Sequence, residues 1–126
     1  RTAVERFGAA SAVGYELDAE LVRTAKLASA DEPRIECRHA AAEEAEEALR
    51  AADVVTLYLS ERGNATLLPL LARSLRPESR IVSFVWEMPF PSLRTVSLAG
   101  SGAPIRLFTG RCCHAYLRDR GVQRGH

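Results

Sequence analysis

Glu16 is the residue of this sequence whose type and position most directly suggest chemistry. It lies near the end of a short alternating apolar run, residues 12–17, and Asp18 after it is a typical first residue of a helix. In open sheets of parallel strands, ligands bind beyond the carboxyl ends of the strands, where a carboxylate can accept hydrogen bonds from both hydroxyls of a ribose. Glu16 is therefore a candidate ribose-binding acid. The alternative is a solvated acid at a strand end.

Two further strand ends carry candidate residues. Tyr58 and Ser60 lie at the end of the apolar run 53–59, where they could line a substrate pocket, although Tyr58 could equally serve packing. His39 ends another expected strand and could titrate near neutral pH, but a histidine there is more often a packed strand residue than a catalytic one. These residues can form one site only if their strands lie parallel and side by side.

Cys112, Cys113 and His114 are residue types that bind metals. Adjacent cysteines without a second pair do not match the spacing of structural zinc sites, so we predict no metal site. Three cysteines, two of them neighbours, also make no disulfide framework, which indicates reduced thiols in an intracellular protein.

The elements that must position these residues alternate between strand and helix. Apolar runs predict strands over residues 12–17, 34–39, 53–59 and 80–86. Helical spacing predicts helices over residues 18–30, 41–51 and 67–75, with residues 60–64 as a loop that ends in an Asn64 cap. Short connections between such elements imply right-handed crossovers, and so an α/β fold with an open, mostly parallel sheet and helices on both faces. The nearly continuous apolar run 53–59 suits a central strand covered on both faces.

The two ends of the chain are less regular. Residues 1–7 resemble the last turns of a helix that Gly8 ends, and the sequence begins without Met, which suggests a fragment. Residues 95–98 and 105–108 predict a C-terminal antiparallel hairpin. Residues 111–126 are basic and show no clean periodicity. We therefore predict one domain over residues 1–110 and a basic tail over residues 111–126.

Length and composition limit the function classes. The 126 residues allow one small domain, and the 47% hydrophobic and 26% charged residues are typical of a folded protein. Lys and Arg number 17 and Asp and Glu 16, a net charge of +1. Such a chain lacks the broad basic footprint of a nucleic-acid-binding protein, so we expect no nucleic-acid partner. No run approaches the roughly 18 apolar residues of a membrane span.

Several segments resemble class I S-adenosylmethionine-dependent methyltransferases, whose fold is Rossmann-like. They are residues 14–21 (GYELDAEL), 53–59 (DVVTLYL), 67–71 (LLPLL), 75–77 (LRP) and 80–83 (RIVS). Within that superfamily, Tyr58-Leu59, Asn64 and Met88-Pro89 are similar to small lysine methyltransferases that modify mitochondrial membrane proteins. The resemblance spans residues 1–91. It implies S-adenosylmethionine as the cofactor, a protein lysine as the methyl acceptor, and a mitochondrial or cytoplasmic location.

The resemblance also implies residue roles. Glu16 matches the ribose-binding acid, Leu17 matches the residue beside the adenine, and Glu43 is the first acid available to meet the adenine amino group. Methyl transfer of this kind works by positioning the donor and an uncharged acceptor, so no side chain must act as a strong base. A water-excluding pocket would lower the pKa of an amine acceptor by desolvation.

The family's first strand and its glycine-rich loop, which cradles the methionine part of the cofactor, match nothing in this sequence. We therefore expect these 126 residues to bind the cofactor poorly, to show little activity, and to self-associate through an incomplete sheet. Two other interpretations stay open. One is a nicotinamide-dependent Rossmann domain, because an acid after the second strand serves both cofactors. The other is a non-catalytic remnant of a methyltransferase.

Overall fold

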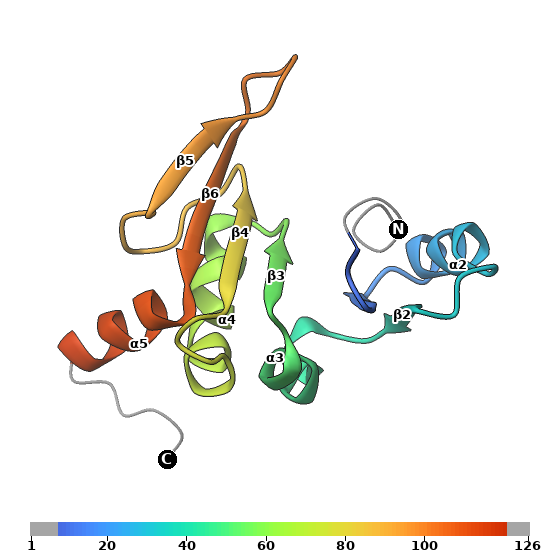
Figure 1. Ribbon diagram of the computed structural model, residues 1–126, viewed down its shortest axis with the longest axis horizontal. Helices are drawn as coiled ribbons and strands as arrows, with labels where there is room; N and C mark the ends of the chain where they lie inside the picture. The colour runs from blue at the N-terminus through green and yellow to red at the C-terminus, as the bar shows by residue number, and fades with distance from the viewer. Residues whose placement is uncertain (1–7, 121–126) are drawn as a thin grey trace. The chain divides into compact units, whose positions relative to one another are not determined.

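The computed structural model describes residues 8–120 (Figure 1). Residues 1–7, for which the sequence predicts a helix end, and residues 121–126 of the predicted tail lie outside the described part. The elements in chain order are β1 (Ala12–Glu16), α2 (Ala19–Ala28), β2 (Ile35–His39), η1 (Ala42–Glu44), α3 (Glu46–Ala51), β3 (Val54–Leu57), α4 (Glu61–Ser74), β4 (Arg80–Phe84), β5 (Arg94–Ser97), β6 (Pro104–Thr109) and α5 (Gly110–Asp119). The predicted α/β class is confirmed. The chain divides into two compact units, one up to Ala45 and one from Glu46.

The first unit is a strand–helix–strand unit with a two-stranded parallel sheet. β1 pairs with β2, with Glu16 opposite His39. α2 begins where the sequence predicts, because Asp18 Oδ1 accepts hydrogen bonds from the backbone N–H groups of Glu20 and Leu21 at 2.9 and 3.4 Å. Because the two strands are parallel, their carboxyl ends meet at one edge of the sheet.

The second unit contains a four-stranded sheet in the order β3-β4-β6-β5. β3 and β4 run parallel, with Leu57 opposite Ser83. β6 lies antiparallel between β4 and β5, so the predicted C-terminal hairpin is confirmed, and its second strand lies against β4. Tyr58 and the loop that follows Phe84 therefore both leave the sheet at the carboxyl ends of parallel strands.

One face of this sheet carries the core of the second unit. α4 lies behind β4 in Figure 1, and α4 and α5 pack against each other. Leu71 of α4, Ile81 of β4, Phe108 of β6 and Cys113 of α5 are all 0% exposed. The residues that alternate with these along β4 point to the opposite face, where Val82 and Phe84 are only half-buried.

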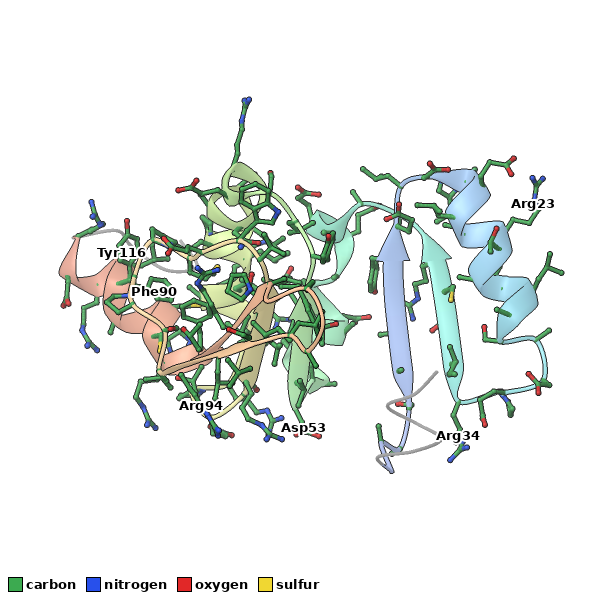
Figure 2. The ribbon with its side chains drawn as sticks, turned by 90° about the horizontal axis from the view of Figure 1, so that it is seen from above. Arg23, Arg34, Asp53, Phe90, Arg94 and Tyr116 are labelled. Carbon is green, nitrogen blue, oxygen red and sulfur yellow. The ribbon has the colours of Figure 1, made fainter. Side chains whose placement is uncertain are left out.

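The helix α5 occupies residues for which the sequence showed no periodicity. Its buried side chains, Cys113 and Leu117, form a stripe only one residue wide, and polar residues surround it in the sequence. Tyr116 of α5 also contacts the loop before β5: its ring centroid lies 5.3 Å from that of Phe90, and Figure 2 shows the two side chains next to each other. Residues 111–119 are thus helical and contribute to the core.

The start of α4 differs from the prediction. Ser60, not Asn64, is the N-cap, because Ser60 Oγ accepts a hydrogen bond from the backbone N–H of Gly63 at 2.9 Å. Asn64 lies inside the helix and is fully buried. Pro69 consequently falls in the middle of the helix, where it has no N–H to donate. The sequence pattern missed the first turn because residues 61–64 contain no large apolar side chain.

The environment of β3 also differs from the prediction of a central strand covered on both faces. Among the described strands, β3 pairs with β4 alone and so lies at a sheet edge, and Val54 is 44% exposed. β1 and β2 form the separate two-stranded sheet of the first unit. The predicted helix over residues 41–51 is divided into η1 and α3.

Candidate functional site

Glu16 and Leu17 end β1 with their side chains open to solvent and their backbone held in place. The carbonyl oxygen of Glu16 accepts a hydrogen bond from the Ala40 N–H at 3.1 Å. His39 Nε2 donates to the carbonyl oxygen of Leu17 at 2.9 Å. Leu17 is 68% exposed, and the Glu16 side chain is exposed beside it. The structure thus gives His39 a positioning role and supplies no sign of a catalytic one.

Glu43 lies on the short turn that follows β2. The neighbouring Glu44 is committed to that turn, since its Oε2 accepts a hydrogen bond from the Ala41 N–H at 2.8 Å. Glu43 is exposed and makes no ion pair with a described residue. An exposed acid and an exposed leucine at one strand end, with a second exposed acid after the neighbouring strand, fit a ligand with a diol and a flat apolar ring.

Tyr58 and Ser60 follow β3 in the second unit. Tyr58 is 76% exposed, and its ring centroid lies 6.4 Å from that of Phe84, with the ring planes tilted by 45°. Ser60 Oγ caps α4 by accepting a hydrogen bond from the backbone N–H of Gly63. The pocket that the sequence predicts at these residues stays a prediction: Tyr58 has the required exposure, whereas the Ser60 hydroxyl already has a structural role.

A buried polar cluster holds the loop after β4, and the sequence analysis did not identify it. Asn64 Nδ2 lies 3.1 Å from Ser83 Oγ, 3.4 Å from the Trp86 carbonyl oxygen and 3.2 Å from the Glu87 carbonyl oxygen. Ser83 Oγ donates to the Trp86 carbonyl oxygen at 2.7 Å. Asn64 and Ser83 are both 0% exposed, and Asn64 Oδ1 has no hydrogen-bond partner among the described residues. A polar residue inside a leucine-rich helix was the available signal.

Val85 starts this loop in a conformation that β-branched residues rarely adopt. Its φ is 71°, and the Trp86 N–H donates to the Phe84 carbonyl oxygen at 2.8 Å, which closes a γ-turn. The Val85 N–H donates to the Pro104 carbonyl oxygen at 2.8 Å, and the Arg106 guanidinium donates to the Val85 carbonyl oxygen. The turn is therefore held from both sides by β6, and it directs Trp86 away from the strand.

The remaining sequence candidates form no site of their own. No described residues form a group of three or more His, Cys, Asp or Glu placed to hold a metal. Burial raises the pKa of the Cys113 thiol to about 12, so this cysteine stays a neutral core residue. A hollow of about 350 Å³ lies between the end of α2 and the start of β2, where Lys26, Pro33 and Ile35 are among its lining residues. No described helix is long and apolar enough to cross a membrane.

The chain was compared with protein-family models, with curated proteins and with solved structures. A scan against protein-family models and a search of curated proteins found no match. Among solved structures, the chain is similar to that of an RNA methyltransferase from Salinibacter ruber in complex with S-adenosyl-L-homocysteine. The two chains are 32% identical with a TM-score of 0.76, and the similarity covers 86% of this chain and 70% of that chain.

This similarity contradicts the expectation of a protein substrate with no nucleic-acid partner. The expectation of no nucleic acid relied on the net charge of +1, which averages two unlike parts. The expectation of a protein substrate relied on the resemblance to small lysine methyltransferases. Residues 1–45 contain six Lys and Arg against nine Asp and Glu, a net charge of −3. Residues 46–126 contain eleven Arg against seven Asp and Glu, a net charge of +4. Taken separately, the second unit is basic, which is the sign of charge that a nucleic-acid-binding surface requires.

Proposed function

Because this chain belongs to the S-adenosylmethionine-dependent methyltransferases, we propose that it transfers a methyl group from S-adenosylmethionine to RNA. The observation that carries the proposal is the 32% identity, over 86% of this chain, to an RNA methyltransferase in complex with S-adenosyl-L-homocysteine. RNA replaces the protein lysine as the methyl acceptor. Membership of this family also sets aside the nicotinamide-dependent alternative.

In this proposal the first unit binds the nucleoside part of the cofactor. Glu16 accepts hydrogen bonds from the ribose hydroxyls, Leu17 lies against the adenine, and Glu43 faces the adenine amino group. The exposure of all three side chains supports these roles, as does the backbone pairing that holds the end of β1. When bound, S-adenosylmethionine supplies an electrophilic methyl group, so the task of the protein residues is to orient the acceptor and exclude water.

The activity is tested by following methyl groups from radiolabelled S-adenosylmethionine into a mixture of cellular RNA and protein. We expect slow labelling that ribonuclease removes. Label that protease removes instead would contradict the RNA proposal. No label in either fraction would contradict methyltransferase activity for these residues and favour the non-catalytic interpretation.

The role of Glu16 is tested by titrating the ¹⁵N-labelled protein with S-adenosylhomocysteine and following the amide signals by NMR, which detects weak binding. In Glu16→Gln the ribose loses a charge-assisted acceptor worth about 1.5–3 kcal/mol, so we expect the affinity to fall roughly tenfold to hundredfold. Glu20→Gln is the matched control. It removes the same charge from an exposed residue of the same unit, whose ion pair with Arg23 is largely exposed to solvent. Equal affinities of the two variants would contradict the assignment.

A further inference from the structure

Two exposed aromatic side chains stand at the carboxyl-end edge of the four-stranded sheet. Tyr58, the first residue after β3, is 76% exposed, and Trp86, two residues after β4, is 43% exposed. The ring centroid of Phe84 lies 6.4 Å from that of Tyr58 with the ring planes tilted by 45°, and the exposure of Tyr58 leaves most of its ring accessible. Exposed rings of this size at the ends of parallel strands mark a place where a ligand binds.

The backbone beneath Trp86 is held far more firmly than an exposed loop requires. Two buried donor groups, Asn64 Nδ2 and Ser83 Oγ, make three hydrogen bonds to the carbonyl oxygens of Trp86 and Glu87. The γ-turn at Val85, with φ 71°, adds backbone strain that the surrounding hydrogen bonds must offset. Strain that is maintained in this way is typical of functional sites. Here its effect is to present the indole of Trp86 to solvent.

The charge of the second unit as a whole suits a polyanion, although two exposed acids lie near the rings in sequence, Glu61 and the Glu87 that pairs with Arg106. The second unit has a net charge of +4. Arg62, in the first turn of α4, is exposed and makes no ion pair with a described residue, and Arg94 on β5 is exposed likewise. Proteins that bind single-stranded nucleic acid combine stacking aromatic rings with cations for the backbone, because every base has a π face.

We propose that Tyr58 and Trp86 form a base-stacking site for single-stranded RNA on the second unit. This inference rests on the proposed RNA methyltransferase function and adds how the acceptor is recognised. Tyr58, which has Phe84 as a neighbouring ring, stacks one base, and Trp86 stacks a second. The hydrogen bonds of Asn64 and Ser83 position Trp86 without touching the RNA.

The test measures the affinity of the 126-residue protein for a fluorescein-labelled, mixed-sequence single-stranded RNA by fluorescence anisotropy. Stacking contributes enough per base that Tyr58→Leu should weaken binding by roughly 5- to 100-fold. Tyr58→Phe keeps the ring and should bind like the unmodified protein. Leu93→Ala is the control for loss of an exposed apolar side chain, since Leu93 is 64% exposed on the same unit. It should bind unchanged.

Trp86 supplies a second readout because the sequence contains a single tryptophan. RNA should quench its fluorescence in parallel with the anisotropy change. RNA binding without quenching, and with Tyr58→Leu equal to Tyr58→Phe, would overturn the stacking site while leaving the RNA methyltransferase proposal intact. No RNA binding by the unmodified protein would overturn both. Thermal melting by circular dichroism checks that each variant is folded.

Discussion

At the scale of single residues, Asn64 has the most demanding position in the second unit. Its side chain is 0% exposed in a helix whose other large buried side chains are leucines. Its amide group donates hydrogen bonds to the carbonyl oxygens of Trp86 and Glu87. Those carbonyls belong to a loop without regular structure, so they have no strand or helix partner. Asn64 therefore links the folding of α4 to the placement of the Trp86 loop.

We predict that Asn64→Ala lowers the free energy of unfolding by roughly 2–3 kcal/mol, because buried carbonyl groups lose their donor and a small cavity remains. Urea denaturation measures this change. Thr66→Ala is the control on the same helix. Thr66 is exposed and bonds only to the Arg62 carbonyl oxygen, so its loss should change stability by less than about 0.5 kcal/mol. Similar effects of both substitutions would contradict a structural role for the buried amide.

At the scale of elements, the N-terminus of α5 is docked onto the connection between α4 and β4. The Gly110 N–H donates to the Ser79 carbonyl oxygen at 2.9 Å, and the Arg111 N–H donates to that of Pro77 at 3.0 Å. A Cβ on Gly110 would overlap the carbonyl oxygen of Arg76, which is backbone and cannot rotate away. This close approach explains why a helix with a narrow apolar stripe still packs tightly.

Gly110→Ala should therefore lower the free energy of unfolding by about 2–3 kcal/mol, through overpacking that displaces α5. Thermal or urea unfolding followed by circular dichroism tests it. Gly14→Ala in β1 provides the contrast, because its added Cβ meets no atom within 4 Å. Replacing a strand glycine by alanine should leave stability unchanged or raise it by up to about 1 kcal/mol. A tolerated Gly110→Ala would show that α5 docks less closely than described.

At the scale of the whole molecule, burial is distributed unevenly between the two units. Val22 and Ala45 are the buried apolar residues of the first unit within the described chain, whereas Leu71, Ile81 and Phe108 of the second are completely covered. A two-stranded sheet with one helix buries little apolar surface and is marginal by itself. The proposed cofactor-binding residues thus lie on the less stabilised unit.

Hydrogen–deuterium exchange followed by mass spectrometry should resolve this difference. We expect slow amide exchange in β4, β6 and α4 and exchange at least tenfold faster in β1, β2 and α2, because local opening costs less where fewer apolar contacts break. S-adenosylhomocysteine should slow exchange in the first unit if Glu16 and Leu17 bind it. Equal amide exchange rates in the two units would contradict the conclusion that the first unit is the less stable one.

The amino-acid sequence by itself determined the local features and the family. The Asp18 cap, the parallel strand–helix–strand unit, the C-terminal hairpin and the methyltransferase resemblance all follow from short-range patterns, because caps, turns and alternation depend on neighbouring residues. Glu16, Leu17 and Glu43 stay predictions: Glu16 follows from its place at a strand end, and Leu17 and Glu43 follow from the family resemblance.

Only the tertiary structure decided features that depend on distant partners. The burial of Asn64 requires the loop after β4, the helical state of residues 111–119 requires the surface of α4, and the strained turn at Val85 requires β6. The partners of each strand are set in the same way, with β1 paired to β2 in one sheet and β3 paired to β4 in another. The expectation of no nucleic acid used one net charge for two units of opposite sign, and that division of the chain comes from the tertiary structure. Long-range contacts, unlike caps and alternation, leave no periodic trace in a sequence.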